Sequence, residues 1–69
     1  MMNMTPWDRA MMHYNWAMHL VSTRKTGPAL ASVRLAVSGF SETIEADSSR
    51  ENQARNMISR CSGYLKKIC

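Results

Sequence analysis

The spacing of the apolar residues constrains the fold most, because they recur every three or four positions through most of the chain. That spacing places them along one side of an α-helix, which turns once in about 3.6 residues. The alternation of apolar and polar residues that is typical of strands is absent, and valine and isoleucine occur at helical spacing. The sequence therefore predicts an all-α fold, either an antiparallel helical hairpin or a three-helix bundle.

The first helix has a clear start signal. Thr5 is a good N-cap, Pro6 suits the first helical position, and Asp8 stands three residues after Thr5, as in a capping box. This pattern predicts that the helix begins at Pro6.

The first helix also has a stop signal. Arg24 and Lys25 suit a helix C-terminus, where the helix dipole favours cations. Gly27 then supplies a flexible stop, and Pro28 ends one helix readily and begins another. We therefore expect a helix over about residues 6–25 and a tight connection to the next.

The second helix is expected over residues 28–45, with two neighbouring stripes. The large apolar stripe is Leu30, Val33, Val37, Phe40 and Ile44. The small stripe beside it is Ala29, Ser32, Ala36, Gly39 and Thr43. Because small residues allow a neighbouring helix to approach closely, we expect the first helix to lie against these two stripes.

A third helical segment is expected over residues 49–67, and its connection to the second helix has two interpretations. The chain turns at Asp47–Ser49, or residues 28–67 form one helix of about 60 Å. No glycine or proline occurs between Ser41 and Ser62, which is compatible with the long helix. The turn is favoured, because aspartate and serine are good turn and cap residues.

The segment MMHYNWAMHL, residues 11–20, carries apolar residues on two opposite sides of the first helix. One side is a regular core stripe of Trp7, Met11, Tyr14, Met18 and Val21. The other side carries Met12, Trp16 and Leu20, which would form a contiguous exposed patch typical of an interface. The patch is interpreted first as a self-association surface. A partner-protein site and burial between the other two helices are the alternatives.

The length of 69 residues allows one domain, residues 1–69, with little core. Such a chain buries only about 60% of its unfolded surface and usually needs a disulfide, a metal or another copy of itself. Cys61 and Cys69 would lie about 12 Å apart along a helix, beyond disulfide reach, so both are expected to be free thiols, with Cys61 in the core. Homo-oligomerisation is therefore the expected source of further burial.

No metal site or cofactor is predicted. His13 and His19 are six residues apart, which points them about 240° apart around a helix. Catalytic features are also lacking: there is no glycine-rich phosphate loop, and no cysteine stands beside a histidine. We therefore expect a protein that is not an enzyme.

The expected location is cytoplasmic. The N-terminus MMNMTPWD has neither the basic nor the apolar region of a signal peptide. No apolar run approaches the roughly 20 residues of a membrane span, so no membrane partner is expected.

The net charge of +4 is compatible with an anionic partner. The candidate contacts to nucleic acid or to a nucleotide-type anion are Arg24, Lys25, Arg55, Arg60, Lys66 and Lys67. A solvated basic surface is the plainer interpretation of these residues, and no helix-turn-helix pattern is present.

Two functions follow from these observations. The first is a small non-enzymatic helical module that oligomerises and binds or blocks another macromolecule, as many accessory and inhibitor proteins of phages and mobile elements do. The alternative is a basic helical dimer that binds nucleic acid, or a nucleotide-type ligand, through arginine and lysine. A phosphate binder would weaken steeply with salt, whereas a protein-binding module would depend on Met12 and Trp16.

Overall fold

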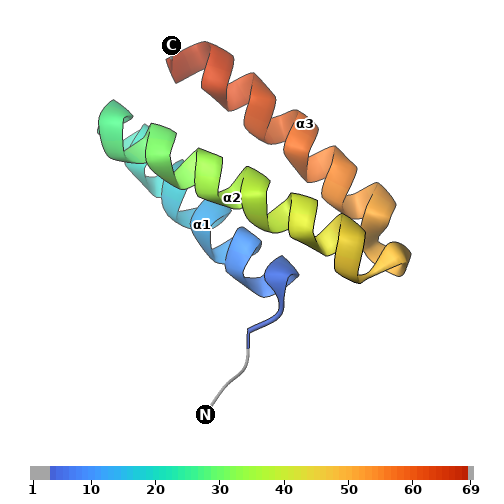
Figure 1. Ribbon diagram of the computed structural model, residues 1–69. Coiled ribbons are helices and arrows are strands. Elements are labelled where there is room, and N and C mark those ends of the chain that lie inside the picture. Colours follow the sequence, from blue (N-terminus) through green and yellow to red (C-terminus); the bar gives the residue numbers. More distant parts are fainter. Residues whose placement is uncertain (1–3, 69) are drawn as a thin grey trace.

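A computed structural model describes residues 4–68, and over that range the chain is helical and contains no strand. It forms α1 (Pro6–Ser22), α2 (Thr26–Ala46), the short 3-10 turn η1 (Ser48–Arg50) and α3 (Glu51–Ile68). Figure 1 shows α2 running antiparallel to both neighbours, so α1 and α3 point the same way. The predicted all-α fold is confirmed, in its three-helix form.

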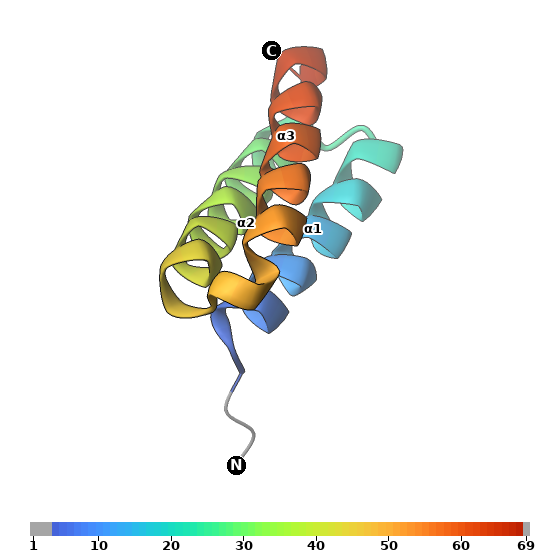
Figure 2. The same ribbon diagram turned by 90° about the vertical axis from the view of Figure 1, so that its right-hand side faces the viewer.

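Helix α2 packs extensively against both other helices, whereas α1 and α3 approach each other at only a few positions. In the turned view of Figure 2, α3 lies across the side of the α1–α2 pair. The molecule is therefore a close pair of helices with a third helix laid against it.

The predicted capping box of α1 is confirmed. The hydroxyl of Thr5 accepts a hydrogen bond from the backbone N–H of Asp8 at 3.1 Å. The Asp8 carboxylate accepts one from the backbone N–H of Thr5 at 3.4 Å. The two side chains thus satisfy N–H groups that the first turn of a helix leaves without partners.

The connection between α1 and α2 differs from the expectation. Helix α1 ends at Ser22, and Arg24 adopts the left-handed conformation with φ 63°. The backbone N–H of Lys25 bonds to the Leu20 carbonyl at 2.9 Å, and the N–H of Arg24 bonds to the Val21 carbonyl at 3.1 Å. These two bonds form a Schellman motif, whose left-handed position is usually glycine.

Gly27 and Pro28 consequently lie in the first turn of α2, which begins at Thr26, and the expected start at residue 28 was too late. Proline is tolerated in a first turn because its missing N–H has no helical partner there. The sequence pattern marked the correct region, but the backbone reverses at Arg24 rather than at the glycine.

The second connection is a turn at Asp47, and the continuous helix over residues 28–67 does not form. Asp47 is extended, with φ −144°, and its carboxylate accepts a hydrogen bond from the backbone N–H of Ser49 at 3.1 Å. An aspartate side chain that captures a nearby N–H competes with helical hydrogen bonding, which explains why the chain leaves the helix here.

The core of α1 also differs from the expectation. Its buried residues are Ala10, Ala17 and Leu20, whereas the stripe of large residues that was expected to form the core is only partly buried. Helix α2 approaches the alanine side so closely that a Cβ atom added to Gly39 would lie 2.7 Å from the Ala10 Cβ. The small stripe of α2 therefore meets the alanines of α1, in what we call the α1–α2 seam.

The large residues of α1 pack at the edge of this seam and toward α3. Trp7 meets buried Phe40 of α2 edge to face, with ring centroids 5.2 Å apart. Ala54 and Cys61 of α3 are buried, so the expectation that Cys61 is a small core residue is confirmed. Burial raises the pKa of the Cys61 thiol above its ordinary value of 9.0. The prediction for Cys69 lies outside the described residues.

None of the helices over residues 4–68 combines the length and the apolar character that crossing a membrane requires.

Candidate interaction surfaces

The first candidate surface is an exposed apolar area on α1 and α2. Met12 and Trp16 of α1 are 49% and 55% exposed, and Leu35 of α2 is 52% exposed. The Trp16 ring stacks on His19, with ring centroids 5.2 Å apart. His13 lies between the two helices, since it lines one hollow with Met12 and Trp16 and another with Leu35. We call Met12, His13, Trp16, His19 and Leu35 the outer face.

The assignment of Leu20 to this surface was wrong, because Leu20 is only 4% exposed. Helix α2 lies nearer to the Leu20 side of α1 than the expected core stripe implied. Leu35 was missed, although its position on a helical wheel is informative. It falls outside both stripes of α2, where an apolar side chain has no partner within the chain.

The second feature is the separation of charge along the helices. All five carboxylates lie where α1 begins, α2 ends and α3 begins, and we call this the acidic end: Asp8, Glu42, Glu45, Asp47 and Glu51. Three arginines pair with them, Arg9 with Glu42 at 3.2 Å, Arg50 with Asp47 at 3.7 Å and Arg55 with Glu51 at 3.1 Å. Arg55, a predicted anion contact, is thus engaged with a carboxylate.

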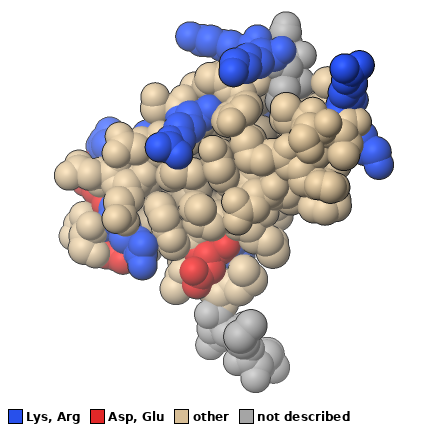
Figure 3. Space-filling model, turned by 180° about the vertical axis from the view of Figure 1, so that it is seen from behind, with Lys and Arg blue, Asp and Glu red and all other residues tan. Residues whose placement is uncertain are grey.

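The opposite end of the molecule is basic. Arg24 and Lys25 lie in the connection between α1 and α2, and Lys66 and Lys67 lie in the last turn of α3. Figure 3 shows most of the lysine and arginine in view over the upper part of one face, and the carboxylates below, with paired cations beside them. The basic end thus collects four of the predicted anion contacts, because up-and-down topology brings the end of α3 to the same end of the molecule as the first connection.

Arg34 and Arg60 lie nearer the middle of their helices, and like the basic end they have no carboxylate partner among the described residues. Arg34 was not among the predicted contacts. Both side chains are exposed.

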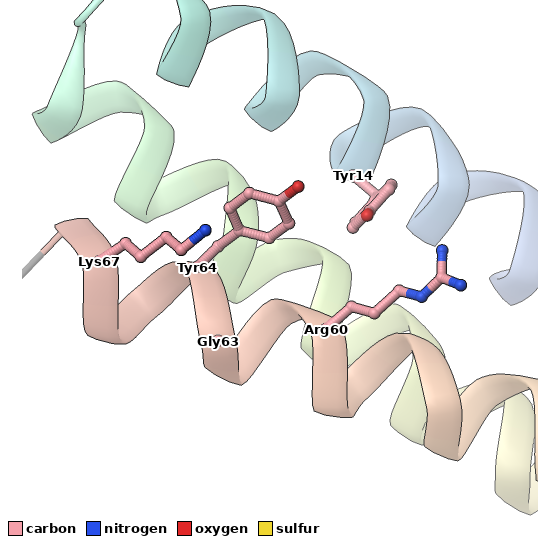
Figure 4. Close-up of a pocket in the computed structure, with 5 residues that line it drawn as sticks. All are labelled: Tyr14, Arg60, Gly63, Tyr64 and Lys67. Atoms are coloured by element: carbon pink, nitrogen blue, oxygen red, sulfur yellow. The ribbon is translucent and has the colours of Figure 1, made fainter.

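The third feature is a cleft between α1 and α3, of about 350 Å³, which we call the α1–α3 cleft. It is lined by Tyr14 of α1 and by Arg60, Gly63, Tyr64 and Lys67 of α3. Figure 4 shows the two tyrosines and both cations reaching into the space between the helices. Arg60 and Lys67, which were predicted only as part of a basic surface, thus belong to one defined site.

The two aromatic rings of the cleft meet edge to face, with centroids 6.3 Å apart. The Nζ atom of Lys67 lies 5.7 Å from the centre of the Tyr64 ring, within the range of a cation–π contact. Burial raises the pKa of Tyr14 above its ordinary value of 10.0, Tyr64 adds to this, and the Arg60 guanidinium opposes it. The Tyr14 hydroxyl is therefore a neutral donor and acceptor at neutral pH. The sequence reasoning missed both tyrosines as site residues, and it counted Tyr14 as core.

Over residues 4–68, no three histidine, cysteine, aspartate or glutamate side chains gather into a group that could hold a metal ion. The chain has no match among protein-family models, among curated proteins or among solved structures.

Proposed function

We propose that this protein is a non-enzymatic, self-associating interaction module, in which two copies pair through the outer face and the pair binds or blocks another macromolecule. The observation that carries the proposal is the exposure of Trp16, Met12 and Leu35 on one side of the α1–α2 pair. Tryptophan is a frequent anchor of protein interfaces, and methionine adapts to an irregular partner. A small accessory or inhibitor protein is the class of function that fits this design.

The composition of the core supports pairing. Five of the nine buried apolar residues over residues 4–68 are alanines, which contribute little apolar area each. A chain of this length is only marginally stable by itself. Burying the large side chains of the outer face in a second copy would add the apolar area that the core lacks.

The distribution of charge supports one orientation of the pair. The outer face lies near the middle of α1 and α2, with the acidic end on one side of it and the basic end on the other. A two-fold axis perpendicular to the helices through Trp16 places each acidic end beside the basic end of the other copy. A parallel pair would place like charges together, which opposes association.

The test is the solution mass, measured by light scattering during size-exclusion chromatography at about 100 μM. The wild type is expected to be a dimer, and Trp16→Glu and Leu35→Glu are expected to be folded monomers by circular dichroism. Ser59→Glu adds the same negative charge on an exposed position of α3 and is expected to remain a dimer. A monomeric wild type, or equal dissociation by Ser59→Glu, would refute the proposal.

The orientation has its own test, by disulfide formation in a Cys69→Ser background. Arg9 and Thr23 lie seven residues before and after Trp16, on the same side of the first helix. In the antiparallel pair, Arg9→Cys is expected to cross-link with Thr23→Cys when the two variants are mixed. Cross-linking of Arg9→Cys only with itself would establish a parallel pair instead.

A further inference from the structure

We infer that the α1–α3 cleft binds a nucleotide unit of a single-stranded nucleic acid, with its base against Tyr64 and the phosphates on either side of it at Arg60 and at Lys67. This site goes beyond the proposed function, because no residue of the cleft belongs to the outer face. Different variants therefore test the two proposals.

The cations of the cleft are placed to bind phosphate. Arg60 and Lys67 are seven residues apart on α3, about 10 Å along its axis, and both are exposed. Among the described residues neither has a carboxylate partner, in contrast to the three arginines at the acidic end. A guanidinium group and an ammonium group that no carboxylate neutralises are the groups that proteins use most often for phosphate oxygens.

The aromatic side chains suit a flat ring. Tyr64 lies between the two cations along α3, and its edge-to-face contact with Tyr14 fixes the ring. Gly63 leaves the helix surface beside it bare, since an added Cβ atom would meet nothing within 4 Å. Stacking of a base on a tyrosine or on a guanidinium plane is the usual way in which proteins hold unpaired bases.

The size of the cleft limits the ligand. Its volume of about 350 Å³ lies at the lower end of the range for small-molecule sites. It therefore suits one nucleotide unit rather than a folded protein segment. Because stacking needs only the face of a base, the site is expected to discriminate little between base sequences.

The charges outside the cleft favour a strand over a free nucleotide. Lys66 lies next to Lys67 on α3, and Arg24 and Lys25 lie at the same end of the molecule. A free nucleotide carries its phosphates at one end only. A strand carries a phosphate on every nucleotide, so its neighbouring units can use the basic end.

The experiment is a fluorescence anisotropy titration of a labelled twelve-residue oligothymidylate. Arg60→Gln and Lys67→Gln are each expected to weaken binding at least about 10-fold and to reduce the salt slope by about 1. Arg34→Gln removes the same charge from an exposed position of α2 that does not line the cleft. It is expected to weaken binding less than about threefold, as a general charge effect.

The role of the ring is tested with Tyr64→Leu and with heparin, a polyanion without bases. Tyr64→Leu is expected to weaken oligothymidylate binding at least about fivefold and to leave heparin binding within about twofold. Tyr64→Phe keeps the ring and is expected to bind as the wild type does. This second variant keeps the test valid if Tyr64→Leu does not fold.

Three results would overturn the inference. The first is the absence of saturable binding of the oligonucleotide below about 1 mM, and the second is equal weakening by Arg34→Gln and Arg60→Gln. The third is binding of poly-glutamate as tight as that of the oligonucleotide, which would make the site a general acceptor of acidic chains. If thymidine monophosphate binds the wild type as tightly as the oligonucleotide does, and Arg60→Gln abolishes this binding, the cleft is a site for a nucleotide and not for a strand.

Discussion

The two neighbours of α1 pack against it in opposite ways. Toward α2, alanine, glycine, serine and threonine bring two helices together until no atom can be added at Gly39. Toward α3, large side chains of α1 such as Tyr14 meet large side chains of α3, hold these two helices apart and leave the α1–α3 cleft. The same helix thus has one neighbour at minimal distance and another at the distance that large side chains set.

The two kinds of packing suit two different roles, a rigid support and a ligand site. Small side chains have little conformational freedom, so the α1–α2 seam defines one geometry and supports the outer face as a rigid surface. Large side chains with several rotatable bonds fill space less completely, and their polar ends remain available to a ligand. The side that is expected to tolerate substitution is therefore also the side that carries the cleft.

The largest expected effect comes from adding volume to the α1–α2 seam. Gly39→Leu inserts four carbon atoms where even a Cβ atom would lie 2.7 Å from the Ala10 Cβ. We expect a loss of about 3 kcal/mol in the free energy of unfolding, which is most of the stability of so short a chain. Urea denaturation followed by circular dichroism measures it.

The control for this prediction is a double-mutant cycle. Gly39→Ala is expected to destabilise the protein although alanine favours helices by about 1 kcal/mol. Ala10→Gly removes the atom that the new Cβ would strike. If the double variant is not more stable than the sum of the two single effects predicts, the seam is looser than its geometry indicates.

The sequence predicted the helices well and their partners less well. The capping box at Thr5 and the turn at Asp47 were predictable because both depend on side chains that bond to nearby backbone atoms. Hydrophobicity alone did not predict that the alanines of α1 form its core while its large apolar residues lie at the edge. Ala10 and Ala17 are weakly apolar, and only the small stripe of α2 makes them the closest contact.

The candidate sites likewise divide into a part that local sequence patterns predict and a part that depends on how the helices pack. Met12 and Trp16 were predictable as an exposed pair because a regular helix fixes their direction. Arg60 and Lys67 were predicted as anion contacts, but the cleft also needs Tyr14 from another helix. Which residues of α1 face α3 depends on the angle between the helices, which a single sequence does not encode in any local pattern.

A second prediction uses alkaline pH to test how tightly α3 is packed. The pKa of Cys61 is raised above 9.0 by burial, so the folded state holds this proton more tightly than the unfolded chain does. The resulting stability is fully present below about pH 9 and is lost as the pH rises through the folded-state pKa. We expect the free energy of unfolding to fall by up to about 1.4 kcal/mol per pH unit above pH 9.

Two variants identify the groups responsible. Cys61→Ala is expected to flatten the decline that begins near pH 9. Tyr14→Phe is expected to flatten a further decline above pH 10, because the pKa of Tyr14 is also raised, chiefly by burial. Stability that is constant up to pH 11 in the wild type would show that neither group is shielded from water, and that α3 packs more loosely than its buried cysteine implies.

The smallest expected effect is a gain in stability. It comes from replacing a glycine of α3 by alanine, the same type of substitution that damages the α1–α2 seam at Gly39. Gly63→Ala lies in the interior of α3, where an added Cβ atom meets nothing within 4 Å and φ is not positive. Alanine restricts the unfolded chain and favours the helix, so we expect an increase of about 0.5–1 kcal/mol in the free energy of unfolding. Thermal denaturation of Gly39→Ala and Gly63→Ala side by side measures the contrast. Effects of the same sign in the two glycine variants would mean that the α1–α2 seam is not packed more closely than the α1–α3 cleft.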